Sequence, residues 1–306
     1  MSRSCRLTAL AAAVTAISVV VIAPSASAEE QPQYVGWAEL LPGLAQGYDP
    51  TSADLCQSGS IRCVDAVIRA MDRRFRPLAG ACDHDAVFAL TYLRTTERYR
   101  EVTADGTFFT DTPFVNHQDA VFADFYFRAY DDWHGGNRSR VAPAWAVAFE
   151  AADAGQVSGV GNLLLGMGGH VNHDLPLALE SIGIVKPDGS SRKVDHDRVD
   201  RILQPLVGPL LAEVAGRFDP TADDASVGGT TLDETAVFQI LAEWREEAWR
   251  NAELLVSAPT PAARDLVADT IAHAAVAKAQ LIVEMTRYAP PLTGPGPRDA
   301  FCASNG

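Results

Sequence analysis

Residues 163–179 read LLLGMGGHVNHDLPLAL, and this stretch decides how the chain folds. It sets His170, His173 and Asp174 into a strongly apolar run, and no Asp, Glu, Lys or Arg occurs from residue 154 to residue 172. A run of this length and composition is typical of a helix that is buried on all sides. The three ionisable side chains are therefore expected inside the protein.

These ionisable groups share one helical stripe with core residues. Leu163, Met167, His170 and Asp174 follow one another at intervals of three or four residues, so they lie on one face. Burying such groups unpaired costs several kcal/mol, and the stripe therefore needs a partner. A metal ion and a hydrogen-bond network between helices both meet that need. Pro176 removes a backbone donor and is expected to kink the helix just after Asp174.

The remainder of the chain also has helical periodicity. We expect a helix from about residue 64 that ends before Pro77, because Val64, Val67, Met71 and Phe75 form an amphipathic stripe. No alternating strand pattern competes with the helices. The sequence predicts an all-α fold, a single multi-helix bundle around a buried, Pro-kinked central helix. The further expected helices cover residues 85–101, 116–130, 143–154, 157–182, 195–217, 233–257 and 261–287.

The N-terminus has the pattern of a secretory signal peptide. Residues 1–28 combine Arg3 and Arg6, an apolar stretch and the small residues Ser-Ala-Ser-Ala at the end. We therefore expect a secreted, extracellular protein that begins near Glu29. An all-α domain is predicted over residues 29–288, followed by a Pro/Gly-rich tail at 289–306 that has no core of its own.

Cysteine usage agrees with export to an oxidising compartment. Cys5 belongs to the signal peptide, which leaves four cysteines and three possible pairings. We favour Cys56 with Cys63, which closes a local loop, and Cys82 with Cys302, which ties the C-terminal tail to the domain. The prediction is two disulfides.

The net charge limits the possible partners. The formal charge is −14 and becomes −16 once Arg3 and Arg6 are removed with residues 1–28, which contain no acid. Such an acidic surface repels polyanions, so nucleic acid is a poor partner and a small-molecule or lipid-like substrate is favoured. No second hydrophobic stretch predicts a transmembrane anchor after signal cleavage. No glycine-rich phosphate loop is present, so no nucleotide cofactor is expected.

Two further pairs of imidazole and carboxylate occur at helical spacing. His117 and Asp124 are seven residues apart, although Arg128 could instead pair with Asp124. His196 and Asp200 are one turn apart, at the start of a helix where acids are also favoured by the helix dipole. If the helices converge, these side chains could join the central stripe in one polar pocket.

The central stretch resembles a known family of uncharacterised proteins. The segment HVNHDLPLAL at residues 170–179 is similar to the "HIN-x-DLP-x-AL" segment of the mainly actinobacterial domain of unknown function 5995. The resemblance extends to residues 122–126 and 244–254, and thus covers most of the expected mature chain. It implies an α-helical fold and carries no activity with it.

A more distant likeness points to metal chemistry. The spacing of His170 and Asp174, followed by Pro176, resembles a motif of zinc-dependent phospholipases C and related single-strand nucleases. His196 with Asp200 is similar to their second motif, with Asp in place of Glu. Those enzymes also use an N-terminal Trp as a ligand, whereas the mature chain here is expected to begin with Glu.

Together these patterns favour a secreted metal-dependent hydrolase of a small or lipid-like phosphoester or ester, with zinc as the expected ion. Asp124, His170 and Asp174 are the candidate catalytic residues. A metal-free acid–base enzyme that isomerises or cyclises a hydrophobic small molecule is an alternative. A non-catalytic binding or scaffold protein with a structural polar core is another. The candidate metal ligands are His117, Asp124, His170, His173, Asp174, His196 and Asp200.

Overall fold

The structure is a computed structural model of the 306-residue chain. It describes residues 48–222, 226–227, 230–231, 234–288 and 294–306. The expected signal peptide, residues 1–28, and the expected start of the mature chain lie outside the described residues.

The described part of the chain is almost entirely helical, which confirms the predicted all-α fold. A two-residue antiparallel pair, β1 (Ser226–Val227) with β2 (Thr230–Thr231), is the one small sheet among the described residues. The helices are α1 (Ile61–Ala81), α2 (Ala86–Val102), α3 (Thr112–His134), η2 (Arg138–Arg140), α4 (Pro143–Asp153), α5 (Gly159–Gly168), η3 (Gly169–Asp174), α6 (Leu175–Ile182), α7 (Lys193–Arg198), α8 (Asp200–Leu203), η4 (Gln204–Leu206), α9 (Val207–Arg217), α10 (Glu234–Ser257), α11 (Pro261–Met285) and α12 (Pro295–Asn305).

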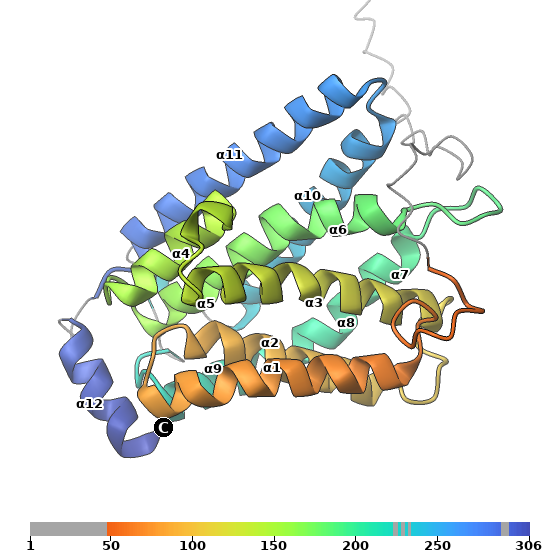
Figure 1. The fold of residues 1–306 in the computed structure, drawn as a ribbon. Coiled ribbons are helices and arrows are strands. Elements are labelled where there is room, and N and C mark those ends of the chain that lie inside the picture. Colours follow the sequence, from red (N-terminus) through yellow and green to blue (C-terminus); the bar gives the residue numbers. More distant parts are fainter. Residues whose placement is uncertain (1–47, 223–225, 228–229, 232–233, 289–293) are drawn as a thin grey trace, which may run out of the picture. The chain divides into compact units, whose positions relative to one another are not determined.

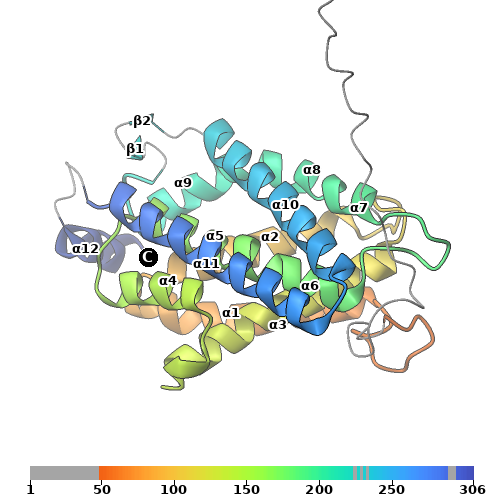
Figure 2. The same ribbon diagram turned by 90° about the horizontal axis from the view of Figure 1, so that it is seen from above.

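The uncharged stretch forms the centre of the bundle. The helices α5, η3 and α6 run on from one another without a loop, and every residue of α5 is buried. The central helix packs against α2, α3, α4, α10 and α11, which explains why it carries so few charges. Figure 1 and Figure 2 show α5 and α6 with α2 and α3 on one side and α10 and α11 on the other.

A π-helical turn directly precedes the place where a kink was predicted, just after Asp174. Residues Gly169–Asp174 are π-helical, and the Leu175 amide donates to the carbonyl of His170, five residues earlier. Pro176 lies in the first turn of α6, where its missing N–H and its ring are incompatible with regular hydrogen bonding to the preceding turn. The wider turn relieves that conflict without ending the helix.

Prolines did not mark the helix ends elsewhere as the sequence suggested. The prediction that the first helix ends before Pro77 was wrong, because α1 continues to Ala81 and buries Leu78 in the core. Conversely, the single helix expected over residues 195–217 is divided. It becomes α7, α8, a short 3₁₀ turn that contains Pro205, and α9.

Both predicted disulfides are present, Cys56–Cys63 and Cys82–Cys302. The second ties down the C-terminal tail, which contains the helix α12 that its Pro/Gly composition did not predict. Arg298 on α12 is almost fully buried, and its guanidinium donates to the Asn162 side chain at 2.7 Å. The tail is therefore held by a covalent bond and by a buried polar contact.

One of the outer helices is unusually apolar. Among the described residues, α11 (Pro261–Met285) is the one helix that is long and apolar enough to cross a membrane by length and composition, with a mean hydropathy of 1.4 over an 18-residue window. One face of α11 is buried in the bundle through residues such as Ile271, Ala275 and Ile282. Core helices pass the same test of length and composition.

Gly166 allows α2 to approach the central helix closely. A Cβ atom added at Gly166 would lie 2.2 Å from Cγ of Phe88 on α2, so the Gly166→Ala variant must displace that ring. We predict that it lowers the free energy of unfolding by about 1–3 kcal/mol in denaturant titrations.

The matched control is Gly216→Ala on the exposed side of α9, where no atom lies within 4 Å of the added Cβ. It is expected to raise stability by up to about 1 kcal/mol, since alanine favours helix more than glycine does. Wild-type stability in Gly166→Ala would contradict the close packing of α2 on α5.

Candidate functional site

The π-helical turn carries the centre of the candidate site, a buried carboxylate with three donors. Asp174 is 2 % exposed and accepts hydrogen bonds from Nδ1 of His170 at 3.0 Å and Nδ1 of His173 at 2.7 Å. The indole Nε1 of Trp145, on α4, donates to the same carboxylate at 2.7 Å. We call these four residues the Asp174 network. Both carboxylate oxygens are thus used inside the protein.

The Asp174 network determines the state of the His170 ring. Burial acts to raise the pKa of Asp174, but the hydrogen bonds from His170 and His173 outweigh it and the pKa lies below its ordinary value. Burial also lowers the pKa of His170, more than its hydrogen bond to Asp174 raises it. The ring is therefore neutral near pH 7. Because a carboxylate only accepts, the single proton sits on Nδ1 and Nε2 is left as an acceptor.

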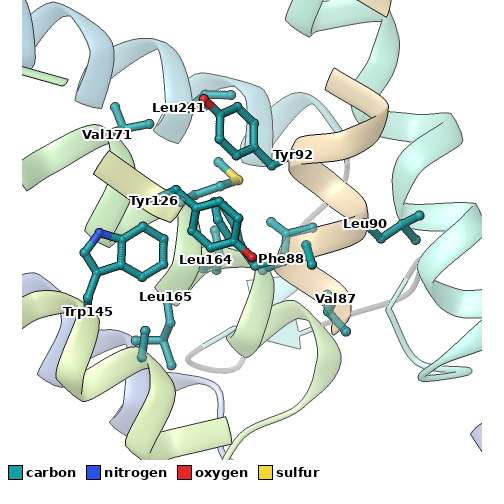
Figure 3. Packing of buried hydrophobic residues seen from close by; sticks show 14 of the residues in the cluster. Val87, Phe88, Leu90, Tyr92, Tyr126, Trp145, Leu164, Leu165, Val171 and Leu241 are labelled. Atoms are coloured by element: carbon teal, nitrogen blue, oxygen red, sulfur yellow. The ribbon is translucent and has the colours of Figure 1, made fainter. Parts of the chain in front are cut away.

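Aromatic rings fix the orientation of His170. Its imidazole stacks on Phe122 of α3 with ring centroids 3.5 Å apart and an angle of 8° between the planes. Tyr92 on α2 lies at 4.5 Å and Trp145 at 6.0 Å from the imidazole centroid. Figure 3 shows Tyr92, Tyr126 and Trp145 gathered in the packed region beside α5. The ring cannot rotate without displacing these neighbours.

His170 is part of the lining of an apolar cavity of about 140 Å³. Helices α2 and α3 and the central helix contribute one part of the lining, and Figure 3 labels two of the lining residues, Tyr92 and Leu241 of α10. The opposite wall is mainly aliphatic. It includes Leu203, Leu206, Val207, Leu210, Val237 and Leu241.

Three residues that line this cavity each have a buried polar atom with no hydrogen-bond partner in the described part of the chain. The atoms are Nε2 of His170, Oη of Tyr92 and Oδ2 of Asp119. A buried polar group without a partner costs about 1–3 kcal/mol. Three of the nine such atoms found in the described residues belong to the lining of this one cavity, which makes it the candidate ligand site.

Burial also raises the pKa values of the other two groups, the carboxyl of Asp119 and the hydroxyl of Tyr92. Asp119 as a whole is half-buried, but its Oδ2 has almost no contact with solvent, and burial raises the pKa of this carboxyl to about 7. Burial, together with the charges of Asp119 and Asp174, raises the pKa of Tyr92 well above its ordinary value. Tyr92 therefore keeps its proton at neutral pH, and Asp119 can give or accept one.

The structure brings together three of the seven predicted ligands, His170, His173 and Asp174. The predicted pair on α3, His117 and Asp124, lies elsewhere. The Nδ1 atom of His117 donates to the carbonyl oxygen of Cys56 at 2.9 Å, beside the first disulfide. Asp124 is 49 % exposed and pairs with Arg128, the partner that the sequence offered as an alternative. Neither residue lines the cavity.

The pair from the following helices also lies apart. His196 is buried against Trp249, and its Nε2 donates to the carbonyl oxygen of Arg245 at 3.1 Å. Asp200 accepts from Nε of Arg245 at 2.7 Å. The expected common pocket for all seven residues is therefore not formed. In the described segments, no group of three or more His, Cys, Asp or Glu side chains is placed to hold a metal ion.

Sequence reasoning missed Asp119 and Tyr92, although a signal for Asp119 was present. Val115, Asp119, Phe122 and Tyr126 follow the same spacing that singled out His170, so an acid lies on an apolar stripe of α3. All but Tyr126 line the cavity. Tyr92 gave no comparable signal, because a tyrosine on a buried helix face is ordinary core composition.

The fold and the site define an all-α protein with an apolar cavity. The lining of this cavity includes His170, whose imidazole is paired with the buried carboxylate of Asp174. A family model described as a family of unknown function (DUF5995) matches residues 64–285. The chain belongs to this family, as its central segment indicated. No curated protein and no solved structure matches the chain. The likeness to zinc-dependent phospholipases C stays a prediction.

The raised pKa of Asp119 predicts a pH-dependent stability. Between 3.8, its ordinary pKa, and about 7, the unfolded chain ionises this carboxyl while the folded chain keeps it protonated. Its contribution to stability therefore falls as the pH rises through this window and is constant above it. Asp119→Asn removes the effect, so we expect the variant to exceed the wild type by about 2–4 kcal/mol at pH 8 and to match it near pH 4.

Denaturant unfolding at the two pH values measures this difference. Asp124→Asn, on the exposed side of the same helix, is the matched control and is expected to change stability by less than about 1 kcal/mol at both. If the stability difference between Asp119→Asn and the wild type is the same at pH 8 as at pH 4, the carboxyl of Asp119 is solvated in the folded protein.

Proposed function

We propose that this protein is a secreted acid–base enzyme that binds a small hydrophobic molecule in the 140 Å³ cavity and transfers a proton within it. The observation that carries this proposal is the presence of three buried polar atoms without partners, from His170, Asp119 and Tyr92, in the lining of one apolar cavity. Of the expectations drawn from the sequence, this arrangement supports the metal-free acid–base enzyme best.

The chemistry follows from the state of each group. His170 is neutral, and the lone pair on its Nε2 has no partner among the described residues, so His170 is the general base. Asp174 holds the imidazole in the correct tautomer and stabilises the imidazolium that forms when Nε2 takes a proton. Asp119, with a pKa of about 7, can donate a proton or a hydrogen bond at the operating pH. A candidate acid, Asp119, and a candidate base, His170, thus line the same cavity.

The size of the cavity limits the substrate to a small molecule. A cavity of about 150 Å³ with an apolar lining is enough for one benzene ring. The cavity here, about 140 Å³, is of the same size. A substrate with one ring and a short substituent fits, whereas a polymer does not.

The predicted metal-dependent hydrolase of phosphoesters receives less support from the positions of the side chains. Six of the seven expected ligands are absent from the cavity lining, and Asp200 is already bonded to Arg245. A phosphate group in the cavity would also meet the carboxyl of Asp119. A zinc-dependent reaction therefore stays a prediction from the sequence, and elemental analysis of the purified protein would test it.

Secretion is supported by the two disulfides, which indicate an oxidising compartment. We propose that export uses residues 1–28 and that the mature chain begins at Glu29. N-terminal sequencing of protein from the culture medium tests this proposal. An intact Met1 in exported protein would contradict it.

A general-base probe tests the proposed enzyme without its natural substrate. 1,2-Benzisoxazole is a neutral bicyclic molecule that opens to 2-hydroxybenzonitrile when a base removes its C3 proton, and the product absorbs in the near ultraviolet. We predict that the protein opens it at a saturable rate, and that His170→Gln lowers kcat by about 100-fold or more.

His273→Gln, which changes an exposed histidine on α11, is the matched control and is expected to leave the rate unchanged. Saturable binding with no reaction would show a non-catalytic binding protein. A rate that survives in His170→Gln would remove His170 from the mechanism.

A further inference from the structure

We infer that the substrate is a hydrophobic ketone or a similar neutral carbonyl compound. Its oxygen accepts hydrogen bonds from Tyr92 and Asp119, and the adjacent C–H group lies at Nε2 of His170. This inference rests on the proposed function and names the substrate class of the same site. It follows from how the polar atoms are distributed over the cavity wall and from which of them can donate.

The cavity has a polar side and an aliphatic side. Tyr92 comes from α2, Asp119 from α3 and His170 from the π-helical turn, so the unpartnered atoms belong to one half of the lining. The other half is contributed by α8, η4, α9 and α10 and is dominated by Leu and Val side chains. A ligand that satisfies both halves has one polar head group and a hydrocarbon body.

An anionic head group does not suit the polar side. Arg245 is the one cation in the lining given by the described residues. Its Nε atom donates to Asp200 at 2.7 Å and its Nη2 atom to the carbonyl oxygen of His196 at 2.5 Å. A carboxylate or phosphate would face Asp119 with Arg245 already engaged. Fatty acids and phosphoesters therefore fit poorly.

A cationic amine fits less well than a neutral group. Pairing an ammonium with Asp119 would require both ions to leave water for an apolar cavity, and the desolvation cost of such a pair can exceed its attraction. Burial favours the protonated form of Asp119 up to about pH 7, and in that form the carboxyl donates a hydrogen bond. The site then offers two O–H donors, Tyr92 and Asp119, and one acceptor, Nε2 of His170.

A carbonyl oxygen matches the two donors with its two lone pairs, and it leaves Nε2 free for the neighbouring carbon. A carboxyl group kept neutral by an apolar site, next to a tyrosine, is a known way to stabilise an enolate. An alcohol would instead use Nε2 for its own O–H group and would block the base. The distribution of donors therefore favours a carbonyl substrate, with alcohols as inhibitors.

The reaction balances without an oxidant or a reductant. Nε2 of His170 takes the proton from the α-carbon, and the electron pair of the broken C–H bond forms a C=C bond to the carbonyl carbon. The carbonyl π electrons move to the oxygen, where Tyr92 and Asp119 hold the negative charge. Return of the proton from Nε2 to the α-carbon regenerates the ketone, and return to a conjugated γ-carbon gives its isomer.

Deuterium exchange into cyclohexanone tests the inference. The exported protein is incubated with cyclohexanone in D₂O, and the mass gain of the ketone is followed against buffer alone and against serum albumin at equal concentration. We expect saturable exchange in the wild type and a loss of at least about 100-fold in His170→Gln. Tyr92→Phe, which removes one oxyanion donor, is expected to lose about 10²–10³-fold in rate.

Binding measurements separate positioning from folding. By calorimetry, His170→Gln should still bind cyclohexanone within about threefold of the wild type, which shows that the cavity is intact. Cyclohexanol should compete with the ketone, whereas cyclohexylamine and cyclohexanecarboxylate should bind at least tenfold more weakly, a difference of about 1.4 kcal/mol. Circular dichroism checks that each variant is folded.

Two outcomes would overturn the inference. Tighter binding of cyclohexylamine than of cyclohexanone would identify an amine site, and bound cyclohexanone that exchanges no faster than in buffer would show that no α-proton is removed. If benzisoxazole is still opened by the wild type in either case, the substrate class is wrong and the acid–base function stands. If neither compound binds or reacts, both proposals fail.

Discussion

The structure depends on how the carboxylate of Asp174 is accommodated inside an apolar bundle. A charge at this depth is tolerated only when its hydrogen-bonding capacity is filled, and here two imidazoles and an indole fill it. The indole of Trp145 also joins α4 to the central helix. The hydrogen bond that stabilises the carboxylate therefore also fixes the proton of His170 on Nδ1, and it leaves Nε2 without a partner among the described residues.

The protein retains several features that cost stability. A π-helical turn replaces regular helix, a cavity interrupts the packed core, and Tyr92, Asp119 and His170 each carry a buried polar atom without a partner in the described residues. Local rules of folding are broken mainly where function requires it. These departures lie around one cavity, and the two disulfides, whose cysteines do not line it, supply stability elsewhere.

Much of the fold could be predicted, because buried helices and cysteine pairing leave local patterns in the sequence. The uncharged stretch predicted the central helix, and the charged groups within it predicted that His170 and Asp174 act together. The wider site could not be predicted, because it depends on contacts between distant segments. Asp200 is bonded to Arg245, which lies 45 positions further along the chain, and this bond keeps Asp200 out of the predicted pocket. No local pattern in the sequence reveals that contact. Asp119 gave a local signal, but only the structure shows that its carboxyl shares a cavity with His170.

The protonation of the His170 ring tests the central claim most directly. Long-range ¹⁵N–¹H NMR of histidine-labelled protein, with His170→Gln to assign the signals, reports which ring nitrogen carries hydrogen. The account predicts a proton on Nδ1 and none on Nε2 from about pH 6 to pH 8. A proton on Nε2, or a doubly protonated ring at pH 7, would contradict it, because the cavity would then contain no base.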